Sequence, residues 1–244
     1  MKSKLICIAV ATTFMSLSVQ AADIDALQNL GQAEFKSLSK DLTSALSYKA
    51  VAPAEPLGLT GFDVGIEVTG TSLDSSTIWE KATGKDLSTL PIAKLHAHKG
   101  LPLGIDLGAV YSAVPGSNIK LMGGELRYAI VQGNVALPAV GIRAAMTKLS
   151  GVDQLEFSSK SVELSVSKGF AILTPYIGVG QVWSTSTPQN ITIASTSVNL
   201  AEEKNSVTKL FAGANVNFGL VNFAGEFDKT GDNNSYSLKV GLRF

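Results

Sequence analysis

From Gly61 to the end of the chain, apolar and polar residues alternate with a period of two in about ten short segments. Side chains two residues apart on a strand point to the same face, so this pattern predicts strands with one apolar face each. The final segment is the most regular, and its apolar face carries Tyr236, Leu238, Val240, Leu242 and Phe244. The chain beyond residue 61 is therefore expected to be all-β.

The opposite faces of these segments carry charged and histidine side chains. Their signs are mixed, which favours pairing among them over selection of one kind of ion. The residues concerned are Asp63, Glu67, Lys94, His96, His98, Asp106, Glu125, Arg127, Arg143, Glu163, Lys209, Glu226, Lys239 and Arg243.

Two architectures fit this alternation: a soluble sandwich or lipocalin-like barrel with apolar faces inward, or a transmembrane barrel with apolar faces outward. The connections favour the second, because long links alternate with tight turns along the chain. The expected long links are 71–90, 113–118, 149–160, 184–206 and 228–235. We therefore predict an antiparallel up-and-down transmembrane β-barrel of about ten strands (8–12), with the charged faces lining its lumen.

Residues 1–21 have the order of a secretory signal peptide: two lysines, an apolar run, and small residues before a cut near Ala21. The apolar run is about 13 residues, shorter than the roughly 20 that a membrane-spanning helix needs. The sequence thus predicts export through the Sec pathway. Cys7 is the only cysteine, so the mature chain has no disulfide and no thiol chemistry. The balance of 20 basic and 20 acidic residues gives no indication of a nucleic-acid partner.

Residues 22–49 are expected to form an amphipathic helix, because Leu27, Phe35, Leu38 and Leu42 recur at three- and four-residue spacing. Gly31 is a possible interruption, and residues 50–60 form a Pro/Gly linker before the barrel at 61–244. We place the helix on the periplasmic side. It can plug the barrel mouth, lie along the membrane interface, bind a periplasmic partner, or serve only as a tether or cap.

The last strand, with its terminal Phe244, resembles the C-terminal insertion signal of Gram-negative outer-membrane proteins. The segment 57–65, which follows a helix, also resembles a family of uncharacterised proteobacterial outer-membrane proteins. The first resemblance implies recognition by the barrel-assembly machinery, insertion into outer-membrane lipid, and an assembly role for Tyr236, Leu238, Val240, Leu242 and Phe244. The second brings no assigned activity and no functional residues.

His96 and His98 are the only histidines, and on a strand they point the same way. Two ligands do not make a metal site, so both are expected to join the polar lumen, and no metal or cofactor is predicted. A barrel-embedded hydrolase is the least favoured alternative, because the sequence has no Gly-x-Ser-x-Gly motif and no convincing pairing of a histidine with a nucleophile. No enzyme is therefore expected.

About ten strands enclose an interior little wider than their own side chains. The first functional hypothesis is a narrow channel or carrier for small solutes, gated by the N-terminal helix. The alternative is a structural or interaction barrel with a closed, salt-bridged lumen and no transport. The oligomeric state stays open.

Overall fold

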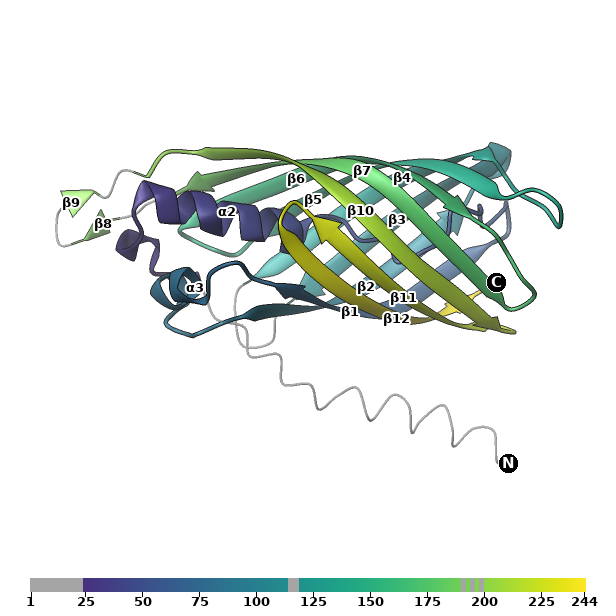
Figure 1. The fold of residues 1–244 in the computed structure, drawn as a ribbon, viewed down its shortest axis with the longest axis horizontal. Helices are drawn as coiled ribbons and strands as arrows, with labels where there is room; N and C mark the ends of the chain where they lie inside the picture. The colour runs from purple at the N-terminus through teal and green to yellow at the C-terminus, as the bar shows by residue number, and fades with distance from the viewer. Residues whose placement is uncertain (1–23, 114–118, 190–191, 194–195, 198–199) are drawn as a thin grey trace, which may run out of the picture.

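The computed structural model describes residues 24–113, 119–189, 192–193, 196–197 and 200–244. The predicted signal peptide, residues 1–21, lies outside this part of the chain, so its prediction is not addressed by the structure. Ten antiparallel strands close into a barrel (Figure 1). They are β1 (Phe62–Ser72), β2 (Thr89–Gly100), β3 (Ile105–Ala113), β4 (Lys120–Val131), β5 (Ala139–Ser150), β6 (Leu155–Ser167), β7 (Leu173–Pro188), β10 (Glu203–Phe218), β11 (Val221–Thr230) and β12 (Asn233–Arg243).

Each strand pairs with the next along the chain, and β12 pairs with β1 to close the ring. The closing register runs from Asp63 opposite Arg243 to Thr71 opposite Ser235. The two short strands β8 (Thr192–Ile193) and β9 (Thr196–Ser197) form a separate sheet in the connection between β7 and β10. The predicted antiparallel up-and-down barrel of about ten strands is confirmed.

The polarity of this barrel is the reverse of that of a soluble protein. Every strand carries large apolar side chains on the outer surface, such as Leu238 at 67% and Ile177 at 64% exposure. The alternate positions point inward and are mostly charged, hydroxylated or small, with Glu67 and Lys209 at 0% exposure. The apolar outer faces of all ten strands form a band around the barrel, which we call the apolar band.

The two ends of the barrel differ. Phe62 and Phe244 lie at one end, the short-turn rim, where the connections are 101–104, 132–138, 168–172 and 219–220. The opposite end, the long-loop rim, carries the connection 73–88 with its helix α3 (Ser76–Thr83), and the connection 189–202. Two predicted long links are wrong: 149–160 reduces to residues 151–154, and 228–235 reduces to 231–232.

These links are shorter because the strands continue beyond the apolar band. Ser158 and Lys160 on β6 are exposed on the outside, and they pair in register with β7 although the apolar alternation has already ended. Hydrophobic alternation marks the part of a strand that faces an apolar environment, whereas backbone pairing needs only neighbouring strands. The sequence pattern therefore underestimated the strand lengths near the long-loop rim.

The N-terminal helix is shorter than the expected 22–49. It consists of a 3-10 turn, η2 (Leu27–Asn29), and α2 (Gln32–Leu46), with Gly31 at the N-cap between them. After Leu46 the chain becomes extended, because the barrel wall binds its carbonyl groups: Thr147 donates to Leu46 O and Lys209 donates to Tyr48 O. Within the described residues, no helix has the length and apolar character needed to cross a membrane.

The helix was expected on the periplasmic side, but it lies at the rim opposite the short turns (Figure 1), which are the connections that outer-membrane barrels place in the periplasm. Figure 1 shows α2 inside the barrel at the long-loop rim, beside α3 and at the opposite end from the C-terminus. From Ser47 the chain runs down the lumen to the short-turn rim, where β1 begins. We call residues 24–57 the lumen segment.

Candidate functional site

The lumen and the chain that fills it form the candidate functional site. All residues from Asp41 to Ala54 are buried, so the lumen segment lies inside the ring of strands. Its hydrogen bonds with the wall and the loops follow the barrel axis from one rim to the other. In order from the long-loop rim, these bonds join Leu27 to Gln154 (3.0 Å), Leu46 to Thr147 (2.8 Å), Pro53 to Arg127 (2.6 Å) and Leu57 to Asp106 (3.1 Å).

Helix α2 is amphipathic, and the two sides of the lumen match its two faces. Its apolar stripe packs against a patch of apolar side chains that point inward from β2, β4, β5 and β6. Such packing is the main source of stability for a surface-type helix. The cluster contains Phe35, Leu38, Leu42 and Leu46 of the helix, Trp79 of α3, and Ile92, Leu121, Leu149, Leu155 and Phe157 of the wall.

The polar face of α2 meets β7 and β10, where the inward side chains are small and polar. Ser39 donates to Ser186 with 2.7 Å between the oxygens, and the hydroxyls of Thr43 and Ser184 are 2.6 Å apart. Asn205 adds a bond to Ser39 at 2.7 Å. Buried hydroxyls and amides that bond one another avoid the cost of unsatisfied polar groups. The helix therefore has one rotational setting in which both of its faces are matched.

Helix α3 closes the long-loop rim over α2. Its Trp79 is 1% exposed and donates to Asp41 of α2, with 2.8 Å between Nε1 and Oδ2. Lys81 forms an ion pair with Glu34 in the first turn of α2. This ion pair and the Gly31 amide hydrogen bond hold the pKa of Glu34 below its usual value. The loop after β1 is thus bonded to the lumen segment at two points.

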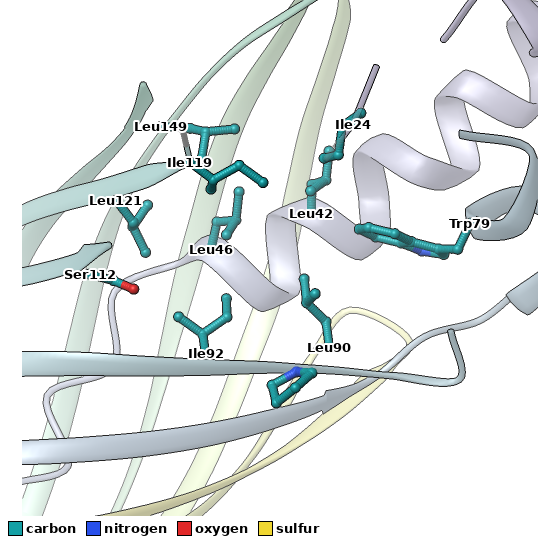
Figure 2. A pocket seen from close by; sticks show the side chains of 11 residues that line it. Ile24, Leu42, Leu46, Trp79, Leu90, Ile92, Ser112, Ile119, Leu121 and Leu149 are labelled. Carbon is teal, nitrogen blue, oxygen red and sulfur yellow. The ribbon is translucent and has the colours of Figure 1, made fainter. Parts of the chain in front are cut away.

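A small cavity remains between α2 and the wall. Figure 2 shows Leu42 and Leu46 of α2 facing Ile92, Leu121 and Leu149 across it. Its volume is about 50 Å³, and nearly all of its lining is apolar. An apolar void of this size is a packing defect that holds at most one or two methylene groups, so it does not by itself form a ligand site.

Between α2 and the short-turn rim, charged side chains line the lumen. Lys49 of the lumen segment forms an ion pair with Asp228 of β11 at 2.8 Å, and both side chains are 0% exposed. Thr230 donates a further hydrogen bond to Asp228 at 2.8 Å. A charge buried this fully is stable only with such partners, so the pair joins the lumen segment to the wall.

The side chain of Tyr48 points toward the two histidines of β2. Its hydroxyl is 3.5 Å from His98 Nε2, which lies 3.3 Å from a carboxylate oxygen of Glu125 on β4. Gly108 of β3 lies in register between His98 and Glu125. A Cβ atom at position 108 would lie 2.3 Å from the imidazole. Glycine at this position therefore leaves the space in which the side chains of His98 and Glu125, on either side of β3, approach each other.

The second histidine belongs to a separate group. Glu67 of β1 accepts from Lys94 at 2.8 Å, and it also contacts His96 and the hydroxyl of Thr69. All four side chains are buried. His96 and His98 therefore have different carboxylate partners, and within the described residues no group of three or more His, Cys, Asp or Glu is arranged to hold a metal ion.

A third group lies on the opposite wall. Glu163 of β6 accepts from Arg143 of β5 and from Lys209 of β10, the latter at 3.1 Å. Lys209 also donates to Tyr48 O of the lumen segment at 3.0 Å. The aromatic ring of Phe211 lies 5.6 Å from the Arg143 guanidinium carbon and 5.1 Å from Lys209 Nζ, a cation–π arrangement. This group binds the wall and the lumen segment together.

Two ion pairs lie close to the short-turn rim. Arg127 contacts Asp106 at 2.6 Å and also donates to Pro53 O, while Asp106 accepts from the Leu57 amide. Lys239 contacts Asp63 at 3.1 Å. The lower end of the lumen segment is therefore held by a charged pair, as its middle is.

The structure places every predicted lumen residue on an inward position, and all of them except the half-buried Arg243 are buried. The sequence analysis did not identify Lys49, Asp228, Tyr48 and Tyr176 as lumen residues. Asp228 lies two positions from Glu226 on the same face, which is the signal that would have found it. Lys49 is the only charge between Asp41 and Glu55, in a run of small residues, and no local pattern indicates its partner.

The predicted assembly residues lie on the outer face of β12 or at its end. Tyr236, Leu238, Leu242 and Phe244 are exposed, and Val240 is half-buried. The Phe244 ring lies 5.5 Å from that of Phe62, at the junction where the barrel closes. Their role in assembly stays a prediction.

A closed antiparallel barrel with an apolar outer band and a polar interior has the architecture of the transmembrane β-barrels. No protein-family model matches the sequence, and no curated protein matches it. Solved structures show a distant similarity. The N-terminal barrel domain of Pseudomonas aeruginosa OprF is 15% identical (TM-score 0.38), covering 75% of this chain and 97% of that one.

Two further solved structures are similar at the same level. OprG, an outer membrane protein of P. aeruginosa, is 8% identical with a TM-score of 0.39, and the match covers 79% of this chain and 99% of that one. The translocator domain of the autotransporter NalP from Neisseria meningitidis is 12% identical with a TM-score of 0.34, covering 92% of this chain and 100% of that one.

Proposed function

We propose that this protein is an integral outer-membrane β-barrel whose lumen is closed by its own N-terminal segment, and that it acts as a structural or interaction barrel. The observation that carries the proposal is the lumen segment itself, which is buried from Asp41 to Ala54 and bonded to the wall at every depth. The charged side chains of the wall beside these residues, such as Glu67 and Lys209, are buried as well, which disfavours an open route for solutes. The binding partners on this proposal are outer-membrane lipid and the barrel-assembly machinery.

The apolar band supports the membrane location. Soluble monomers rarely expose apolar patches larger than a few hundred Å², whereas here apolar side chains are exposed on all ten strands. A closed barrel also satisfies its backbone groups without water, as a structure in lipid must. Outer-membrane barrels place short turns in the periplasm, which assigns the long-loop rim to the cell surface.

The path of the chain argues against gating by simple movement of the helix. If α2 moved outward from the long-loop rim, residues 47–57 would still lie in the lumen, because they connect the helix to β1 at the other rim. Emptying the lumen would instead require breaking the buried pair of Lys49 with Asp228 and the bonds of Lys209 and Arg127. Breaking a buried pair costs about 3–5 kcal/mol.

A channel gated by release of the lumen segment is the second candidate. It is favoured by the polar face of α2, because Ser39, Thr43 and their serine partners on β7 form bonds that water can replace. If the interface of the plug were wholly apolar, water could not replace its contacts with the wall. This candidate would carry small solutes.

Fractionation tests the membrane location. We expect the tagged protein in the outer-membrane fraction, with a mobility on gels that shifts when samples are boiled, because a closed hydrogen-bonded barrel resists detergent until it is heated. Recovery as a soluble periplasmic protein without such a shift would contradict the proposal.

Conductance in planar bilayers separates the two candidates. The closed barrel predicts no channel activity for the native protein, and channel activity for a variant that lacks residues 24–57. In the double variant Ser39→Cys/Ser186→Cys, the two oxygens that now lie 2.7 Å apart are replaced by sulfurs that can form a disulfide. Channels in the native protein and in the reduced double variant that disappear when the double variant is oxidised would support the gated channel instead.

A further inference from the structure

We infer that this barrel delivers the chain that precedes β1 to the outer face of the membrane, so that residues 24–34 are displayed at the cell surface. The inference rests on the proposed membrane location and orientation, and it adds one crossing of the membrane, through the lumen, to the ten made by the strands. It also assigns a surface-exposed attachment point to the beginning of the lumen segment.

The first described residues lie at the long-loop rim. The Ala26 amide donates to Ala82 O of α3 at 3.2 Å, and the Leu27 amide donates to Gln154 in the connection between β5 and β6. Both partners belong to connections at the long-loop rim. Asp25 is exposed at this rim. The chain therefore enters the barrel from the side that carries the long loops.

The route from there to β1 is fixed by burial. Residues 41–54 are buried without interruption, which excludes a path along the outside of the barrel, where alternate residues would be exposed. At the other rim, the Leu57 amide bonds to Asp106, and Phe62 then begins β1 beside Phe244. The two ends of the lumen segment are thus on opposite faces of the membrane in the proposed orientation.

The displayed residues form a small polar surface around the mouth of the barrel. Asp25, Asn29 and Gln32 are exposed there, while the apolar side of the same turns is buried against α3 and the wall. A polypeptide joined to the chain just before this surface would emerge outside the cell without disturbing the packed part of the lumen segment.

Labelling of single cysteines in intact cells tests this topology. The chain has no cysteine after Cys7, so each variant carries one thiol once the predicted signal peptide is removed. We would use Asp25→Cys as the probe, Asp232→Cys in the exposed β11–β12 turn as the control at the same rim, and Val135→Cys, fully exposed between β4 and β5, as the control at the short-turn rim. The reagent is a maleimide that does not cross membranes.

We expect Asp25→Cys and Asp232→Cys to react in intact cells, and Val135→Cys to react only after the outer membrane is permeabilised. Reaction of Asp232→Cys but not Asp25→Cys in intact cells would overturn the surface display while leaving the barrel and its orientation in place. Reaction of Val135→Cys alone would reverse the orientation and also overturn the inference. Recovery of the three variants as soluble protein would reject the membrane barrel itself.

A second variant tests the passage through the lumen. Ser44 of α2 is 0% exposed, and its hydroxyl has no hydrogen-bond partner, so Ser44→Cys changes little in the packing. We expect this thiol to react on the order of 100-fold more slowly in the native protein than in urea, because a buried position is reached only when the structure opens locally. Equal rates in the two conditions would show that the segment lies outside the lumen and would overturn the inference.

Discussion

Lys49 and Asp228 form an ion pair between the lumen segment and the wall in which both side chains are 0% exposed. Replacing Lys49 with Met leaves the Asp228 carboxylate in the lumen without its cation, so we expect a loss of about 3–5 kcal/mol of unfolding free energy. Urea unfolding of the protein in lipid vesicles measures this loss. The matched control is Lys148→Met, whose pair with Glu156 is 63% and 54% exposed, and the expected change is about 0–1 kcal/mol. Equal effects of the two substitutions would contradict the assigned role of Lys49.

Gly108 is the residue over which the His98–Glu125 contact passes. A Cβ atom at this position would lie 2.3 Å from the imidazole and 2.6 Å from the Glu125 side chain. We expect Gly108→Ala to cost about 1–3 kcal/mol in the same urea measurement, because two packed side chains must move. Gly124→Ala is the control on the adjacent strand, since the nearest atom to its new methyl group is 3.7 Å away. A change below about 0.5 kcal/mol for Gly108→Ala would show that the lumen there is loosely packed.

At the scale of elements, α2 depends on its apolar stripe, and Leu42 lies at the centre of that stripe beside the existing cavity. We expect Leu42→Ala to enlarge the void and to destabilise the protein by roughly 2–5 kcal/mol. The control is Leu59→Ala, whose side chain is 64% exposed in the linker. The rate at which Ser44→Cys reacts with maleimide reports docking of the helix directly. An unchanged rate in the Leu42→Ala background would mean that the polar contacts alone hold α2 in place.

The sequence was sufficient to predict that a helix precedes the barrel, because its apolar spacing is local information. It was not sufficient to predict where the helix ends or which rim it occupies. The ending at Leu46 depends on Thr147 and Lys209, which are distant in the chain and bind the carbonyls that an α-helix would otherwise use. The rim that the helix occupies depends on how well the two faces of α2 match two different sides of the lumen wall. These two sides exist only once the strands have been placed in their order around the barrel.

At the scale of the whole molecule, the apolar band is what distinguishes a membrane barrel from a soluble one. Leu238 lies on the outer face of β12 within this band. We expect Leu238→Lys to cost about 2–4 kcal/mol, because a charge near the middle of the bilayer is poorly solvated. The control is Ser206→Lys, an outward position on β10 beyond the apolar residues of that strand. Comparable stability of the two variants in vesicles would argue against burial of this face in lipid.

The fold could be predicted at this scale because period-two alternation, repeated about ten times, allows few architectures. The inward positions of residues such as Glu67 and Arg143 follow from the same alternation. Their partners do not, because pairing depends on the register between strands, and a shift of two residues would keep every side chain on its face while exchanging its neighbours. The ion pair between the lumen segment and the wall was likewise beyond the sequence, since Lys49 and Asp228 are 179 residues apart.

The chain reverses direction near Phe62: the lumen segment runs to the short-turn rim, and β1 runs back along the wall. Because of this turn, the barrel responds differently to a pulling force at each of its two ends. Tension applied to residue 24 from the long-loop rim would draw the lumen segment out contact by contact, and would then separate β1 from its neighbours starting at Phe62. Tension applied to Phe244 from the opposite side would load β12 along its own length and shear its whole ladder at once. The pairing of β1 with β12 therefore resists a pull on Phe244 more strongly than it resists a pull on residue 24.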